Sequence, residues 1–131
     1  MTQEDKNFLL KDLCARLPYG VNVLADCDKT FDQGLIGVLM RIEPYVGIKD
    51  EYQGKYLLYQ YGVFTPSFVD EVRPYLFPLS SMTEEERIAI GNEFAYGQPH
   101  KAMDILHKRH IDYRGLIPKG LAIDATGLNI Y

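Results

Sequence analysis

The chain has 131 residues, of which 47% are hydrophobic and 24% are charged, a composition that is ordinary for one soluble globular domain. At this length a single core can bury roughly two thirds of the surface that the unfolded chain exposes, so folding requires neither a metal ion nor a disulfide. The net charge is −4, with 8 Lys and Arg against 11 Asp and Glu before Pro78, and 6 against 7 from there on. Neither half has the basic excess that is typical of nucleic-acid-binding chains.

Signals for export, membrane insertion and cofactor binding are not found in the sequence. The acidic start Met1–Lys6 does not resemble a secretory signal, and no segment approaches the ~20 apolar residues that span a bilayer. Cys14 and Cys27 fit no metal-ligand spacing, and no P-loop, dinucleotide fingerprint or H-E-x-x-H motif occurs. We therefore expect a cytoplasmic protein with two free thiols, no membrane association and no cofactor.

The N-terminal residues are predicted to form a helix. Thr2 and Asp5 resemble a capping box, and apolar residues recur at helical spacing over residues 3–16. The turn residues Pro18 to Gly20 then end the helix. From Val21 onwards the apolar period changes to two, which indicates a strand.

Four or five short strands are predicted in the strand-rich part of the chain, residues 20–72. They cover residues 21–27, 35–42, 45–48 and 55–61, with a fifth at Val63–Phe64. Short strands joined by brief turns favour a small curved antiparallel sheet or an SH3-like barrel.

The segment from Val72 to Glu86 marks the change from strands to helices. Pro74 and Pro78 each lack a backbone donor and restrict the preceding residue, so we expect neither a helix nor a central strand to pass easily through. Thr83 and Glu86 then form a T-x-x-E capping box, which indicates the start of a helix.

The remaining residues are predicted to form a helical part, 83–114, and a packed tail, 115–131. The helical part contains one helix over 84–94 and a second over 100–113, with Gly115 as its terminating residue. The tail is rich in Leu and Ile, so we expect it to pack on the core. Residues 1–131 are thus predicted to form a single α+β domain.

Three motifs carry a family resemblance. They are D-L-C-A-R-L-P-Y-G-V from Asp12, P-Y-L-F-P-L-S-S-M-T-E-E from Pro74, and I-D-Y-R-G-L-I from Ile111, followed by G-L-A from Gly120. Together they resemble a family of small proteins of unknown function from gut Bacteroidales and their phages and mobile elements. The resemblance implies a lineage and no activity. Family members often carry a longer segment between the second and third motifs, which implies that this chain has a shortened helical part.

Tyrosine is unusually frequent, with ten residues and no tryptophan. Tyr59 and Tyr61 share a face of a predicted strand, and Tyr45 and Tyr56 lie nearby in sequence. Such side chains suit a protein interface, because they offer a large rigid contact area with a polar tip. The alternative is that the same rings fill the core and keep their hydroxyls at its rim.

A locally basic run favours nucleic-acid binding as a second hypothesis. It contains Lys101, Lys108, Arg109 and Arg114, with Tyr96 and Tyr113 near enough in sequence to stack on bases. The alternative is a solvated helix face whose basic last turn complements the helix dipole.

A third hypothesis is a metal site. His100, Asp104 and His107 fall at i, i+4 and i+7, so on a helix they share one face and offer ligands for an ion such as zinc. The alternative is solvated polar surface, with His110 as a partly buried residue at the helix end whose charge favours the negative end of the dipole.

We therefore predict a non-enzymatic interaction or accessory protein. It would hold another protein on the tyrosine-bearing face of the sheet or in the groove between the sheet and the helices. A nucleic-acid-associated module is the alternative prediction, and a metal-dependent hydrolase is the third.

Overall fold

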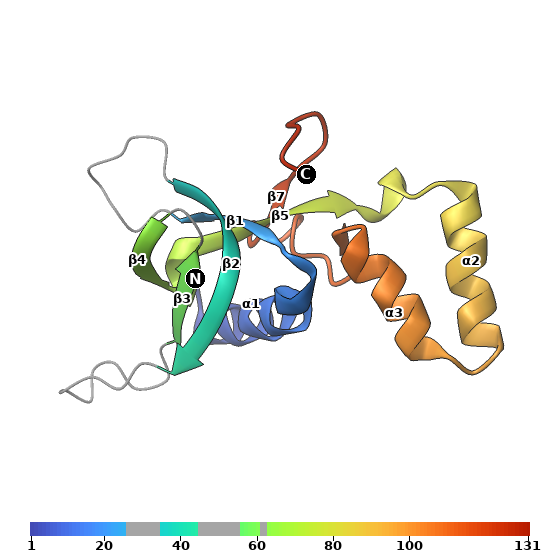
Figure 1. Cartoon of the computed structure of the whole chain (residues 1–131), viewed down its shortest axis with the longest axis horizontal. Coiled ribbons are helices and arrows are strands. Elements are labelled where there is room, and N and C mark those ends of the chain that lie inside the picture. Colours follow the sequence, from blue (N-terminus) through green and yellow to red (C-terminus); the bar gives the residue numbers. More distant parts are fainter. Residues whose placement is uncertain (26–34, 45–55, 61–62) are drawn as a thin grey trace.

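The computed structural model describes residues 1–25, 35–44, 56–60 and 63–131 (Figure 1). Its elements are α1 (Gln3–Arg16), η1 (Leu17–Tyr19), β1 (Asn22–Ala25), β2 (Leu35–Pro44), β3 (Tyr56–Gln60), β4 (Val63–Phe68), η3 (Val69–Glu71), β5 (Val72–Pro78), η4 (Leu79–Ser81), α2 (Glu84–Ala95), α3 (Pro99–Lys108), β6 (Ile111–Asp112) and β7 (Ile123–Asp124). The α+β class is confirmed. The strand predicted over 45–48 lies outside the described residues.

The strands form one mixed sheet in the order β4-β3-β2-β1-β5-β6, with β7 also paired to β5. The long strand β2 pairs with β1 through its first half and with β3 through its second, and the register shifts between Leu39 and Arg41. Pairing is antiparallel from β4 to β5, whereas β6 and β7 run parallel to β5. The prediction of a curved sheet is confirmed. The SH3-like barrel is wrong for the described strands, because C-terminal segments occupy the edge of β5 that closure would require.

The segment after residue 72 forms a strand, contrary to expectation. β5 passes through Pro74, which lies opposite Val23 of β1. A proline within a strand removes one backbone donor. Pro74 is accommodated because, among the described strands, only β1 pairs with β5 at this position, and the pairing with β7 begins at Tyr75.

The main core lies between α1, the sheet and the C-terminal tail. Leu9 and Leu13 of α1 are fully buried against β1, β2 and β5, and the tail contributes Leu116 and Leu121. Its buried members are Leu9, Leu13, Val21, Val23, Ala25, Leu39, Val69, Val72, Leu76, Leu116, Leu121 and Ala122. The predicted packing of the tail is confirmed.

The second core, the hairpin core, lies within the α2–α3 hairpin, which projects from the end of β5 (Figure 1). It consists of the buried residues Ile90, Ala102, Leu106 and Ile111. The predicted capping box is confirmed, because the Thr83 hydroxyl accepts from the Glu86 amide at 3.2 Å and the Glu86 carboxylate accepts from the Thr83 amide at 3.1 Å.

The helix predicted over 100–113 is shorter than expected. α3 ends at Lys108, and His110 adopts the left-handed conformation, with φ of 55°. Ile111 and Asp112 then pair with Phe77 and Pro78 of β5. Gly115 is therefore not the terminating residue, because pairing with β5 takes the chain out of the helix five residues earlier.

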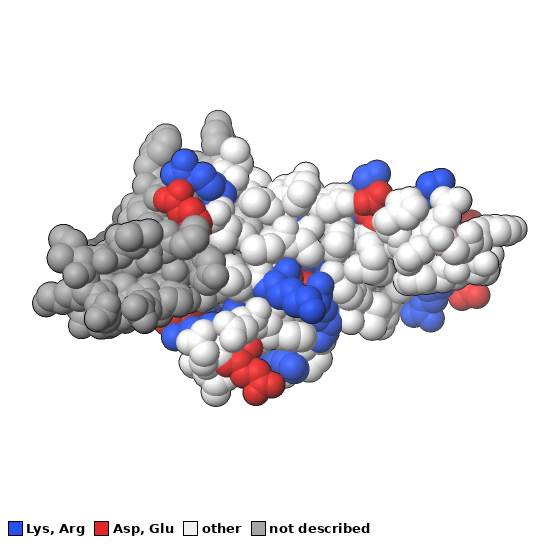
Figure 2. Space-filling model, turned by 90° about the horizontal axis from the view of Figure 1, so that it is seen from below, with Lys and Arg blue, Asp and Glu red and all other residues white. Residues whose placement is uncertain are grey.

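Charges of both signs are mixed over the surface. On the face seen in Figure 2, Lys and Arg lie in small groups, most of them next to Asp or Glu. Within the described part of the chain, no helix is long and apolar enough to cross a membrane.

Candidate functional site

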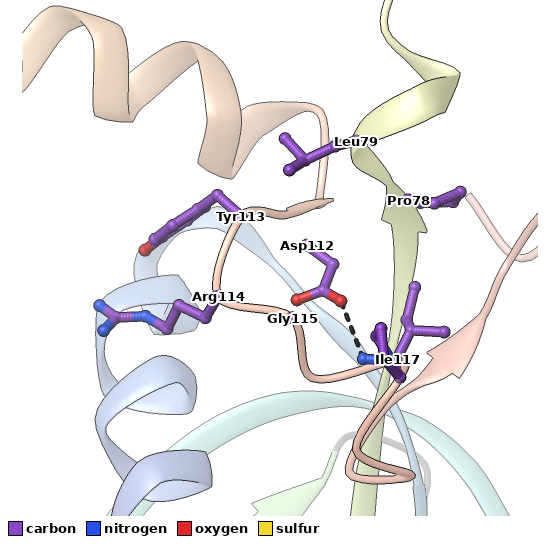
Figure 3. Close-up of a pocket in the computed structure, with 8 residues that line it drawn as sticks. Pro78, Leu79, Asp112, Tyr113, Arg114, Gly115 and Ile117 are labelled. Atoms are coloured by element: carbon purple, nitrogen blue, oxygen red, sulfur yellow. Dashed lines mark hydrogen bonds between the residues drawn. The ribbon is translucent and has the colours of Figure 1, made fainter.

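A pocket of about 450 Å³ lies where the hairpin joins the sheet (Figure 3). One wall is the end of β5 with the start of η4, and the other is the segment that follows α3. The lining residues are Pro78, Leu79, Asp112, Tyr113, Arg114, Gly115, Ile117 and Pro118. The pocket thus lies between the end of a strand and the segment after α3, and none of its lining residues belongs to an α-helix.

The turn after β6 is shaped by Asp112. Its two carboxylate oxygens accept hydrogen bonds from the amides of Leu116 and Ile117, each at 2.8 Å, and the second of these is drawn in Figure 3. Gly115 takes a left-handed φ of 75°, which a residue with a side chain rarely adopts. Asp112 is itself buried. These bonds fix the wall of the pocket, so its shape is present before any ligand binds.

The surface offered by the pocket is largely apolar. Leu79 is 48% exposed at its rim, and Pro78 and Pro118 have no amide hydrogen to donate. The guanidinium of Arg114 points away from the cavity toward α1, so only its stem contributes to the wall (Figure 3). The pocket therefore suits an uncharged apolar group.

Beside the pocket lies a buried ion-pair cluster that joins α1 to β6. Arg16 and Asp12 are fully buried, and the Arg16 Nε donates to Asp12 Oδ2 at 2.7 Å. A terminal nitrogen of Arg16 donates to the carbonyl of Ile111 at 2.6 Å. The Nε of Arg114 lies 3.2 Å from the other Asp12 oxygen. One carboxylate therefore pairs with two guanidinium groups that come from opposite ends of the chain.

Tyr113 connects this cluster to α3. The guanidinium carbons of Arg16 and Arg114 lie 5.2 and 5.1 Å from the centre of its ring, and its hydroxyl is 2.7 Å from His107 Nε2. The His107 ring also packs on Tyr19, 5.1 Å away between ring centres, and the Tyr19 hydroxyl donates to Asp104. We call this set the polar junction; it consists of Asp12, Arg16, Tyr19, Asp104, His107, Tyr113 and Arg114.

The histidines at this end of α3 are held in their neutral form. Burial lowers the pKa of His107, and the positive charge of Arg16 lowers it further. Burial also lowers the pKa of His110 to about 4, with Arg16 and Arg109 contributing. The His110 ring stacks on Tyr131, with 3.7 Å between ring centres, and burial raises the pKa of that tyrosine to about 12. His110 is partly buried near the helix end, as predicted, but burial disfavours the charge that was expected to complement the helix dipole.

The predicted metal ligands have different surroundings. His100 is exposed, whereas His107 is buried against Tyr113 and Asp104 accepts from Tyr19. In the part of the chain that the structure describes, no group of three or more His, Cys, Asp or Glu is arranged to hold a metal ion. The alternative interpretation of this face as solvated holds for His100 but not for His107, which is buried and packs on Tyr19 of η1.

The cations of the predicted basic surface have different surroundings. Arg109 is paired with Glu86 of α2, and Arg114 with Asp12 of α1. Lys101 and Lys108 are exposed on α3. Two of the four cations are therefore engaged in ion pairs within the chain, and nucleic-acid binding stays a prediction.

The predicted tyrosine surface falls mainly outside the described residues. Tyr45 and Tyr61 lie there, and of Tyr56 and Tyr59 only the backbone is described, paired in β3 with Pro44 and Arg41. This surface stays a prediction. Of the two cysteines, Cys14 is a free exposed thiol, and Cys27 is outside the described residues.

The pocket residues were missed as a site, although a signal was present. Apart from Pro118, the lining residues lie in the two motifs that begin at Pro74 and at Ile111. Their meeting in space depends on the pairing of β5 with β6, which no local pattern predicts.

Comparison with known proteins adds no further constraint. No protein-family model, curated protein or solved structure matches the chain.

Proposed function

We propose that the protein is a non-enzymatic interaction module that holds an apolar segment of another protein in the pocket between β5 and residues 112–118. The observation that carries this proposal is the pocket itself. Its volume, about 450 Å³, falls within the range of roughly 300–1,000 Å³ that is typical of ligand sites, and its walls are mainly apolar.

The polar groups around the pocket support binding more than catalysis. Both oxygens of Asp112 accept backbone hydrogen bonds, the Tyr113 hydroxyl is bonded to His107, and Arg114 pairs with Asp12. Groups that are already engaged in this way hold a wall in place but are poorly placed to transfer a proton to a ligand. A rigid wall also lowers the entropy cost of binding.

The direct test compares two leucines of equal exposure. Leu79 at the rim of the pocket is 48% exposed, and Leu128 in the tail is 49% exposed. Partners would be captured on the purified full chain from the cells that express it, using the wild type, Leu79→Asp and Leu128→Asp. We expect Leu79→Asp to lose the captured partner and Leu128→Asp to retain it.

Thermal unfolding of both variants serves as the control for folding, because each change lies at an exposed position and should leave the melting temperature nearly unchanged. Capture of the same partners by the wild type and by Leu79→Asp would show that the pocket is not the binding surface.

A further inference from the structure

The side chain of Tyr131 is held between the sheet and the end of α3. Its ring stacks on His110, with 3.7 Å between ring centres, and packs at an angle on Phe77, with 5.9 Å between ring centres. Its hydroxyl donates to the carbonyl of Tyr75 at 2.7 Å and accepts from the amide of Asn22 at 3.0 Å. We call this set the tyrosine socket; it consists of Asn22, Tyr75, Phe77 and His110.

The hydroxyl of Tyr131 continues the hydrogen bonding between β1 and β5. The two strands pair as far as Val23 and Pro74. Their register places Asn22 opposite Tyr75 at the next step, and there the hydroxyl bridges the amide of one to the carbonyl of the other. An aromatic ring without a hydroxyl would leave both backbone groups without this partner, which lowers its affinity. The socket therefore distinguishes a phenol from a plain aromatic ring.

The socket also binds the backbone that precedes the tyrosine. The side-chain amide of Asn22 donates to the carbonyl of Ile130 at 2.9 Å. The position of His110 is fixed on the other side, because its carbonyl accepts from the amide of Phe77 at 2.8 Å. The groups that receive the tyrosine thus belong to the sheet or are bonded to it, which lowers the entropy cost of binding. This arrangement suits a tyrosine within a peptide.

The segment that carries Tyr131 into the socket is exposed. We call residues Thr126–Asn129 the strap; all of them are exposed, and Figure 1 shows the strap projecting after β7, with the C mark beside β5. Its hydrogen bonds within the described part of the chain are local, to residues 124 and 125. Tyr131 itself remains 44% exposed. Segments of this kind open with a low free energy, so the tyrosine can leave the socket while the sheet stays folded.

We propose that the tyrosine socket is a binding site for a tyrosine residue of a peptide, and that the chain occupies this site with its own Tyr131. The partner is a segment that presents a tyrosine after a residue whose carbonyl faces Asn22. None of the socket residues lines the pocket, so this site is separate from the one proposed above. Because a short tether gives an effective concentration of about millimolar, Tyr131 acts as an intramolecular competitor that the partner segment displaces.

The test removes the internal tyrosine and supplies it as a free peptide. The acetylated tripeptide Asn-Ile-Tyr, which matches residues 129–131, is titrated into the full chain and followed by NMR. We expect Tyr131→Ala to bind it about tenfold more tightly than the wild type does, because the competitor is gone. The tripeptide Asn-Ile-Phe should bind to this variant about tenfold more weakly, because it lacks the two hydrogen bonds of the hydroxyl.

Tyr96→Ala is the matched control, because it removes a tyrosine that is 78% exposed in the hairpin and should bind the tripeptide no better than the wild type. Thermal unfolding checks that Tyr131→Ala is folded. If it is not, Tyr131→Phe keeps the ring and removes the hydroxyl bridge, and amide exchange at Asn22 should become about tenfold faster.

Three results would overturn the proposal. If Tyr131→Ala binds the tripeptide no better than the wild type, the socket is not a site that Tyr131 blocks. If the tyrosine and phenylalanine peptides bind equally, the socket does not recognise the hydroxyl. Unchanged exchange at Asn22 in Tyr131→Phe would show that the hydroxyl does not bridge the strands.

Discussion

The main core and the hairpin core are built from different parts of the chain. The main core joins residues that are distant in sequence, such as Leu9, Val72 and Leu116, whereas the buried members of the hairpin core all lie between residues 90 and 111. The two cores meet at the polar junction, where Arg16 of α1 bonds the carbonyl of Ile111 in β6. Packing therefore forms each core, while hydrogen bonds and ion pairs fix the hairpin on the sheet.

The comparison also explains where the pocket lies. It opens at the border of the two cores, where Pro78 and Leu79 leave the sheet and Asp112 begins the return toward the main core. Directional bonds specify one arrangement at such a border, although replacing buried ion pairs by apolar residues is often neutral for stability. We infer that the polar junction specifies geometry and contributes little net stability.

The largest effect is expected when one partner of the buried ion pair in the polar junction is removed. In Arg16→Met, Asp12 keeps only Arg114 as an ionic partner, and the Ile111 carbonyl loses its donor. Removing one partner of a buried ion pair costs about 3–5 kcal/mol. The free energy of unfolding from urea titration should fall by that amount. The double variant Asp12→Leu/Arg16→Met should recover at least half of the loss, because it removes both charges of the pair. If Arg16→Met costs less than about 1 kcal/mol, the ion pair is not a coupled buried pair and the inference about the polar junction fails.

A pair of leucine truncations should separate the two cores. Leu13→Ala in the main core and Leu106→Ala in the hairpin core each leave a cavity, at a cost of about 2–5 kcal/mol. We expect the cost of Leu13→Ala to lie at the upper end of this range, and we expect the variant to lower amide-exchange protection throughout the chain. Leu106→Ala should cost less and mainly lower the protection of α2 and α3, because the sheet retains its own core. Equal loss of protection everywhere in both variants would show that the cores unfold as one.

Acidification should weaken the contact between the hairpin and the tail. His110 has a pKa of about 4 in the folded chain, and about 6.5 is usual for an unfolded histidine. Between these values the unfolded chain binds more protons, so the free energy of unfolding falls as the pH decreases. Because the ring is only partly buried, solvent screening reduces the effect, and we expect on the order of 1–2 kcal/mol between pH 7 and 4.5.

The control for this pH dependence is a variant that cannot titrate at the same position. His110→Asn keeps a residue type that tolerates a positive φ and should flatten the curve of unfolding free energy against pH. The same slope in wild type and His110→Asn would assign the pH dependence to other groups.

The sequence predicted the features whose causes are local. The capping boxes at Thr2 and Thr83, the start of α2 and the strand periods of β1 and β2 depend on residues within one or two turns of each other. The end of α3 was mispredicted, because it depends on a tertiary contact. His110 adopts a left-handed conformation, and Ile111 then pairs with a strand more than thirty residues earlier in the chain.

The candidate site was not predicted from the sequence. Its walls require the pairing of β5 with β6, which is a tertiary contact. The role of Asp112, which accepts two amides of the following turn, was not predicted. Arg16 and Asp12 are spaced as an ordinary surface pair, and only the fold shows that both are fully buried.

The smallest predicted effect compares the two N-terminal caps. Thr2 and Thr83 make the same capping box, so Thr→Ala removes the equivalent side-chain hydrogen bond from α1 and from α2, at a cost of about 1 kcal/mol. α1 is also anchored by Leu9 and Leu13, whereas α2 buries only Ile90. Thr2→Ala should therefore speed amide exchange only in the first turn of α1, and Thr83→Ala should speed it about fivefold along all of α2.

This difference depends on α2 being held mainly by its own local bonds. The effect of Thr2→Ala should stay confined to one turn, because α1 lies against the sheet. Exchange that is equal along both helices would mean that the hairpin is anchored as firmly as the main core, and that the polar junction contributes more to stability than we infer.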